Sequence, residues 1–242
     1  MAKHSHWHNI RHKKEKEDKK KSKLYSKHSK NIIKAAREGG GDPEKNVALK
    51  RAIDQAKDDD VPKENIQRAI KRGTGELLDE GEMEDIIYEG YGPEGVAILV
   101  DATTDNRNRT SSDLKYVFSD YGGSLGESGS VKWQFNYLAV IEFDKKQIED
   151  IDWEQLQLKF MEAGAEEIMG VEEIKKIRAD KDDYNSLLEV IQKYEIETKQ
   201  EGLKWVPKET ISVKEETEEK VENMIEDLKD LRDVDEVFTN LE

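Results

Sequence analysis

A row of regularly spaced cations is the feature of this sequence best suited to binding a ligand. The row consists of Lys13, Lys16, Lys20, Lys23, Lys27, Lys30, Lys34 and Arg37, at intervals of three and four residues. On an α-helix this spacing places all of them along one face, which we call the basic ladder. Like charges on one helix face repel each other, and the phosphates of DNA or RNA would remove that penalty. The alternative interpretation is a solvated helix face without a ligand.

The charge of the chain is divided very unevenly along its length. Residues 1–37 contain 13 basic and three acidic side chains, which gives a net charge of +10, and residues 1–75 have the same net charge. Residues 76–242 carry −25, so the whole chain has a net charge of −15. We therefore expect nucleic acid to bind at the basic end. The acidic remainder is expected to face a protein partner or to repel nucleic acid elsewhere.

Further candidate residues for nucleic-acid binding lie before and after the ladder. Trp7 lies in the basic segment, where an indole can stack on an unpaired base. Arg107 and Arg109 lie in the first turn of a predicted helix, where cations oppose the helix dipole. Such cations need a partner, which is either a neighbouring acid or a bound phosphate. The predicted contacts to nucleic acid are all residues of the basic ladder and, in addition, His4, Trp7, His12, Arg68, Lys71, Arg72, Arg107 and Arg109.

Catalytic and metal sites are weakly indicated. The alternating His4, His6 and His8 could bind a transition metal, but no cysteine and no acid before Glu15 completes a ligand shell. The glycine-rich segment 122–130 follows a predicted helix and precedes a predicted strand, which is the wrong context for a phosphate-binding loop. We therefore expect no enzyme, metal or cofactor. A metal-dependent hydrolase built on Asp101, Asp105 and Glu127 is the distant alternative.

Composition indicates small domains in a reducing compartment. Only 35% of the residues are hydrophobic while 39% are charged, and there is no cysteine. No segment approaches the roughly 18 consecutive apolar residues of a membrane span, and the N-terminus lacks the apolar region of a secretory signal. We expect a cytoplasmic protein without a membrane partner.

Hydrophobic periodicity predicts an α+β, multi-domain fold. A period of 3.6 residues indicates three short helices in the basic region, with Asp42 and Pro43 starting the second helix and Pro62 the third. Later segments alternate with a period of two and are separated by single helices, which is typical of α/β sandwiches with helices on one sheet face. Predicted strands include residues 131–135, 138–143, 173–179, 210–213 and 234–238, and predicted helices include 153–163 and a long acidic helix after residue 213.

Several longer motifs occur in a specific order over residues 1–135. They are MAKHSHW at 1–7, AAR at 35–37, GGGDP at 39–43, RAIKRGTG at 68–75, YEGYGP at 88–93, TDNRNRT at 104–110 and GSV at 129–131. These motifs strongly resemble the YebC/PmpR family, which includes the mitochondrial translational activator of cytochrome oxidase. One departure from the family pattern is His28, which replaces an apolar residue.

The resemblance implies a three-domain organisation without catalysis. It implies a basic helical domain at residues 1–75, a central α/β domain at 76–135 with 208–242, and an inserted α/β domain at 136–207. It also implies a bacterial cytoplasmic location. Members of the family are described both as DNA-binding transcriptional regulators and as ribosome-associated translation factors that bind RNA and relieve stalling. Both functions stay open at this point.

Overall fold

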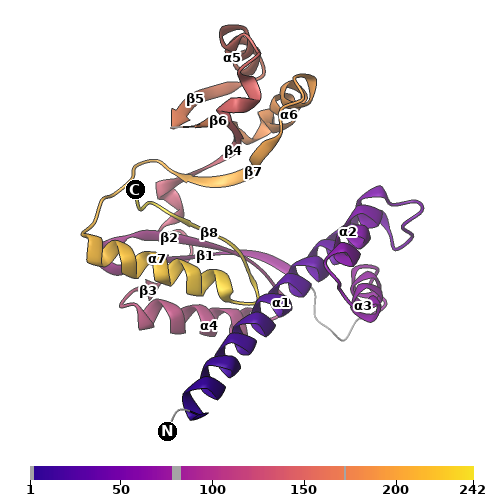
Figure 1. The fold of residues 1–242 in the computed structure, drawn as a ribbon, viewed down its shortest axis with the longest axis vertical. Coiled ribbons are helices and arrows are strands. Elements are labelled where there is room, and N and C mark those ends of the chain that lie inside the picture. The colour runs from indigo at the N-terminus through magenta and orange to yellow at the C-terminus, as the bar shows by residue number, and fades with distance from the viewer. Residues whose placement is uncertain (1–2, 78–82, 172) are drawn as a thin grey trace. The chain divides into compact units, whose positions relative to one another are not determined.

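The computed structural model describes the backbone of residues 3–77, 83–171 and 173–242, and the side chains from residue 21 onward within these ranges, except that of Val171. The chain forms two compact units, residues 1–130 with 213–237 and residues 131–212 with 238–242. A helical N-terminal region precedes two four-stranded sheets with their helices (Figure 1). The predicted α+β class is confirmed, whereas the division into three domains at the boundaries given above stays a prediction.

Three helices form the N-terminal region of the first unit. They are α1 (Lys3–Gly39), α2 (Val47–Asp58) and α3 (Lys63–Gly73). Their shared core contains Ile32, Ile33 and Ala36 from α1, as the helical period predicts, together with Leu49, Ile53 and Ile66 from the other two helices. Pro62 immediately precedes α3, so the predicted start of the third helix is confirmed.

The start of the second helix differs from the prediction. Asp42 and Pro43 lie in a turn, and α2 begins at Val47 with Asn46 as its N-cap. The Oδ1 atom of Asn46 accepts a hydrogen bond from the amide of Leu49 at 3.0 Å. Its Nδ2 atom donates to the carbonyl oxygens of Ala35 and Gly40 at 2.8 and 2.9 Å. The buried Asn46 therefore both caps α2 and ties it to the end of α1, which Asp42 cannot do from an exposed position.

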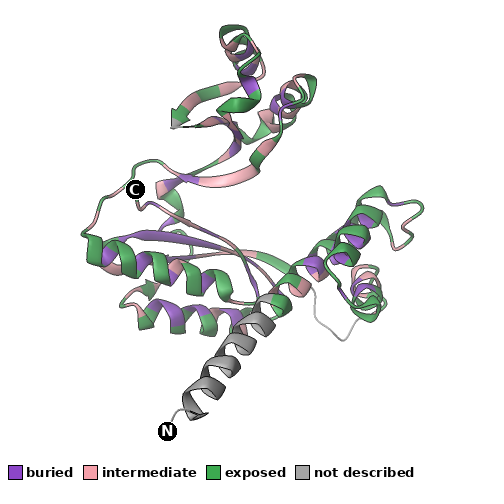
Figure 2. Ribbon diagram, viewed as in Figure 1, coloured by how far each residue is buried: buried purple, intermediate pink, exposed green. Residues whose placement is uncertain are grey.

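The sheet of the first unit has the strand order β3-β1-β2-β8. Its strands are β1 (Glu84–Tyr91), β2 (Ala97–Thr104), β3 (Ser124–Leu125) and β8 (Val234–Thr239). The helices α4 (Arg107–Asp120) and α7 (Glu215–Asp230) run along one face of this sheet (Figure 1), and β2 is buried along most of its length (Figure 2). A Cβ atom at Gly90 would lie 2.4 Å from the ring of Phe118, so α4 can approach the sheet this closely only over a glycine.

The second unit is a sheet with the strand order β5-β6-β4-β7 and two helices. Its elements are β4 (Phe135–Asp144), α5 (Trp153–Glu162), β5 (Ala165–Val171), β6 (Ile174–Asp180), α6 (Tyr184–Lys193) and β7 (Thr198–Pro207). Alternate residues of β4, among them Ile141 and Phe143, pack with Phe160 of α5 and Leu187 of α6. The predicted arrangement of helices packed against a sheet is confirmed here.

Two predicted strands are wrong and two observed strands were not predicted. The segment 131–135 contains a 3₁₀ turn at Lys132–Gln134 before β4 begins, and the segment 210–213 makes only a single bridge, between Ile211 and Leu241. The missed strands are β3, which lies within the glycine-rich segment, and β5. Both pair with a neighbouring strand although their sequences lack clear alternation, because pairing depends on the partner strand as well as on local pattern.

Candidate nucleic-acid interface

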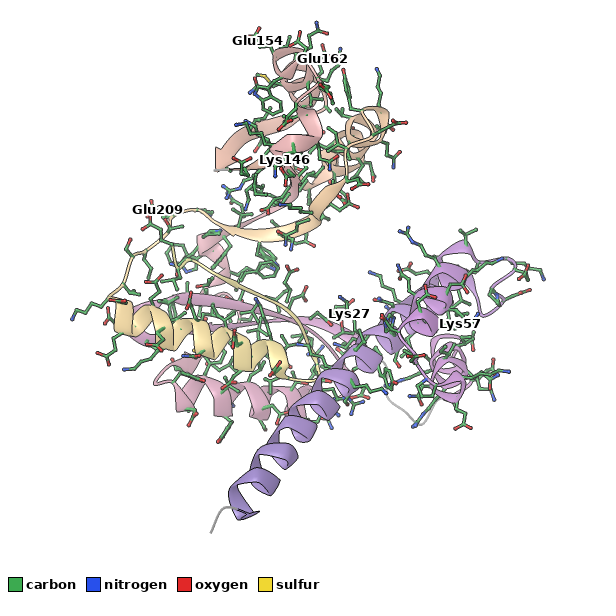
Figure 3. All side chains as sticks on the ribbon, in the orientation of Figure 1. Lys27, Lys57, Lys146, Glu154, Glu162 and Glu209 are labelled. Carbon is green, nitrogen blue, oxygen red and sulfur yellow. The ribbon has the colours of Figure 1, made fainter. Side chains whose placement is uncertain are left out.

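The basic ladder keeps an exposed part in this structure. Between residues 21 and 39, the buried face of α1 contains Ile32 and Ala36, and the ladder lies on a different side. Lys27, Lys34 and Arg37 are exposed, and Lys27 is labelled in Figure 3. Arg37 also donates a hydrogen bond from Nη1 to the carbonyl oxygen of Met83 at 3.4 Å. These three residues form an open cationic surface along the helix.

Lys30 belongs to the ladder by spacing but not by exposure. Its side chain is 9% exposed, and its Nζ atom lies 2.7 Å from Oδ1 of Asp235 and donates to the carbonyl oxygen of Asp233 at 2.9 Å. The predicted phosphate contact at Lys30 does not fit this arrangement, because the ammonium group is buried against an internal acid. Lys30 instead attaches α1 to the strand β8.

Lys23 is intermediate in exposure between the exposed Lys27 and the buried Lys30. Burial lowers the pKa of its ammonium group, while the nearby carboxylate of Asp230 acts in the opposite direction. Its half-buried position beside the end of α7 makes it a weaker candidate for a phosphate contact than Lys27.

Of the three phosphate contacts predicted on α3, two are exposed and the third is used within the fold. Arg68 and Lys71 of α3 are exposed. The guanidinium of Arg72 has its Nη2 atom 3.1 Å from Oδ2 of Asp105, with the arginine side chain only 14% exposed. Arg72 therefore connects α3 to the loop after β2, and its predicted phosphate contact is not supported by its position.

Arg109 completes a buried polar network around Asp233. Its Nε and Nη2 atoms donate to Oδ2 of Asp233 at 3.1 and 2.6 Å, and Nη2 also donates to Oδ1 of Asp105 at 2.9 Å. The hydroxyl of Thr110 donates to the same oxygen of Asp233 at 2.7 Å. Burial alone would raise the pKa of Asp105, but hydrogen bonds from Arg109 and Arg72 outweigh it and lower that pKa.

Acids therefore partner both arginines at the start of α4. Arg107 forms an ion pair with Glu84 of β1. Asn106 caps the helix, because its Oδ1 atom accepts a hydrogen bond from the amide of Arg109 at 3.0 Å. Of the two kinds of partner expected for Arg107 and Arg109, a neighbouring acid or a bound phosphate, the structure supplies acids.

Some predicted residues cannot be placed. The side chains of His4, Trp7, His12, Lys13, Lys16 and Lys20 lie outside the residues whose side chains are described. The sequence also missed residues beside the ladder. Ser22, Ser26 and Ser29 line a cavity with Arg68 and Arg232. The serine spacing of four and three residues was a readable helical signal, whereas nothing in the sequence brings Arg232 to α1.

The acids proposed for a hydrolase do not form a metal site in the described part of the chain. Asp101 is partly buried, and this burial, together with the nearby Asp235, Asp85 and Glu236, raises its pKa to about 6. Asp105 is held by Arg72 and Arg109, and Glu127 is exposed in a loop. The described residues contain no group of three histidine or acidic side chains arranged to hold a metal ion.

Comparison with known proteins identifies the family. The model of the TACO1/YebC protein N-terminal domain matches residues 5–76, and that of the TACO1/YebC second and third domain matches residues 83–241. The chain belongs to the TACO1/YebC family. The resemblance inferred from the sequence motifs is thereby confirmed.

Members of the TACO1/YebC family are similar to this chain over its full length. A protein of Natranaerobius thermophilus named a probable transcriptional regulatory protein is 45% identical over the whole chain and 96% of its own length. A protein of Caldanaerobacter subterraneus with the same description is 47% identical over the whole chain and 98% of its own length.

A solved structure supports the fold. The crystal structure of a conserved hypothetical protein from Aquifex aeolicus matches with a TM-score of 0.71 and 41% identity, covering 91% of this chain and 89% of that one. Among the described helices, none has the length and apolar character needed to cross a membrane.

Proposed function

We propose that this protein is a nucleic-acid-binding regulator that holds a sugar-phosphate backbone with the exposed cations of α1 and α3. The proposed contacts are Lys27, Lys34, Arg37, Arg68 and Lys71. The observation that carries the proposal is that these cations remain exposed on two packed helices although acids neutralise several neighbouring ones. Phosphate contacts of this kind release counterions and supply affinity that does not depend on base sequence.

DNA is the first candidate target, because curated relatives that cover the whole chain are named probable transcriptional regulatory proteins. Ribosomal RNA is the second candidate. The proposed contacts are to phosphates, which both polymers share, and a protein acting on the ribosome would use the same surface. The acidic remainder of the chain is proposed to limit binding to the basic face or to contact a protein partner. We further propose that the protein acts in the cytoplasm, without a catalytic step or a cofactor.

Salt titration tests the interface. The variant Lys27→Gln, Lys34→Gln, Arg37→Gln is expected to bind duplex DNA more weakly, with the slope of log K against log salt reduced by about two to three. A matched control removes three exposed lysines of the second unit, by Lys146→Gln, Lys181→Gln and Lys193→Gln. The control should keep the parent slope. Equal slopes for all three proteins would remove α1 from the interface.

Sedimentation separates the two targets. A cell lysate is treated with DNase and run through a sucrose gradient. A protein that still migrates with ribosomes after this treatment supports the ribosomal target. A protein that stays at the top of the gradient and retards one promoter fragment in the presence of competitor DNA supports the transcriptional one.

A further inference from the structure

A cavity of about 440 Å³ lies in the first unit between α1 and α3, beside the residues that follow α7. One wall is a row of hydroxyl groups on α1, Ser22, Ser26 and Ser29. Their spacing of four and three residues places them on one strip of the helix, between the buried face and the basic ladder. Hydroxyl groups in such a row can donate to phosphate oxygens.

The opposite walls favour an anion. Two acids, Asp105 and Asp233, line the cavity, but Arg72 and Arg109 already neutralise them within the fold. Arg68 and Arg232 also line it, and both are exposed. Within the described part of the chain, Arg232 has no hydrogen-bond or ion-pair partner. The cavity therefore has one cation at its opening, Arg232, beyond those that its own acids require.

An aromatic side chain and apolar groups complete the lining. Tyr25 is half buried, and its hydroxyl donates to the carbonyl oxygen of Asp60 at 2.8 Å, which fixes the ring at the cavity wall. Ile33 and Met83 supply further apolar surface. An aromatic ring beside cations and hydroxyls suits a nucleotide, because the base can stack while the phosphate is hydrogen-bonded. The volume lies within the range of about 300 to 1,000 Å³ typical of small-ligand sites.

We propose that this cavity binds a single nucleotide, with its phosphate against Arg232, Arg68 and the serine hydroxyls and its base against Tyr25. The inference extends the proposed function, because the nucleotide would belong to the strand held by the neighbouring ladder. A free mononucleotide has the same chemistry and is the second source. The structure thus adds a pocket for one unpaired nucleotide to a surface that otherwise contacts only the backbone.

The test uses the full chain titrated with 5′-AMP, 5′-UMP and a 5′-phosphorylated single-stranded pentanucleotide. Arg232→Gln is expected to weaken binding of all three about tenfold, because it removes a charge-assisted hydrogen bond. Arg51→Gln is the matched control, since Arg51 is exposed on α2, away from the cavity lining, and the change in charge is the same. Ser26→Asp, which places a carboxylate on the hydroxyl wall, is expected to reduce binding at least as much. Circular dichroism and the melting temperature check that each variant is folded.

The outcomes separate this inference from the proposed function. Binding that is lost in Arg232→Gln and Ser26→Asp but kept in Arg51→Gln supports the cavity. If mononucleotides bind in this way but long DNA and RNA do not, the cavity stands with a free nucleotide as ligand and the proposed function fails. If long nucleic acid binds with the expected salt slope while the short probes do not bind at millimolar concentration, the cavity is overturned and the proposed function stands. Equal weakening by Arg51→Gln and Arg232→Gln also overturns the cavity.

Discussion

The charged residues of this protein fall into two groups with different roles. Lys30, Arg72 and Arg109 pair with internal acids, whereas Lys27 and Lys34 extend into solvent. Removing one partner from a buried pair leaves an uncompensated charge, so the first group stabilises the fold. The second group costs little to replace and is available to a ligand.

The partly buried Asp101 makes the stability of the fold depend on pH. Burial and the neighbouring Asp235, Asp85 and Glu236 raise the pKa of Asp101 from 3.8 to about 6. Because the pKa is higher in the folded state, the stability contributed by protonated Asp101 is fully present below the unfolded value and is lost as the pH rises through about 6. Ionised Asp101 therefore destabilises the protein at neutral pH.

The variant Asp101→Asn should be more stable than the parent at neutral pH. After allowance for partial solvent screening, we expect a gain of about 1 kcal/mol in the free energy of unfolding. The two proteins should have nearly the same stability near pH 4, where Asp101 is mostly protonated in the folded state. Urea denaturation followed by circular dichroism at both pH values measures the difference. A variant less stable than the parent at neutral pH would contradict the raised pKa of Asp101 in the folded state.

At the level of single elements, periodicity predicted which helices form but not where all of them begin. The hydrophobic spacing in α1, α5, α6 and α7 is clear enough to place their buried faces. The start of α2 depends instead on Asn46, whose amide reaches back to the end of α1. Asp42 and Pro43 are a strong local start signal, and the tertiary hydrogen bonds of Asn46 override it.

Replacement of Asn46 should therefore lower the free energy of unfolding more than replacement of Asp42, the cap that the sequence predicts. Asn46→Ala is expected to lower the free energy of unfolding by about 2 kcal/mol, because it removes the cap and leaves buried groups without partners. Asp42→Ala, at an exposed position, should change it by less than about 0.5 kcal/mol. Chemical denaturation of both variants provides the comparison. If Asp42→Ala had the larger effect, Asn46 would not be the main cap.

The candidate site could be predicted only in part, because contacts with distant parts of the chain decide which cations stay exposed. Spacing along α1 placed the lysines on one face, but Lys30 is removed from that surface by Asp235, which lies 205 residues further along the chain. The partners of Arg72 and Arg109 likewise come from other elements. A sequence pattern can indicate which side chains share a helix face, and it contains no information on which distant acid will cover one of them.

At the scale of the whole molecule, the acidic part of the chain helps to fold the basic part as well as to balance its charge. The pair of Lys30 with Asp235 attaches α1 to the sheet of the first unit. Thr103 of β2 donates to the same aspartate at 2.6 Å. Within the basic ladder, Lys30 thus stabilises the fold, whereas Lys27 and Lys34 are proposed to bind the ligand.

Single replacements in the ladder should separate these two effects. Lys30→Gln is expected to lower the free energy of unfolding by about 1 to 3 kcal/mol, because it removes buried charged hydrogen bonds, and to leave the salt slope of DNA binding unchanged. Lys27→Gln is expected to reduce that slope by about one and to change stability by less than about 0.5 kcal/mol. Thermal melts and salt titrations on the two variants make the comparison. A reduced slope for Lys30→Gln with normal stability would return Lys30 to the interface.

The polypeptide passes between the two units three times, after residues 130, 212 and 237. A single proteolytic cut near residue 212 would therefore not release either fragment, because β8 remains paired in the sheet with β2. A nicked protein is expected to migrate as one species on a native gel and to separate into two only under denaturing conditions.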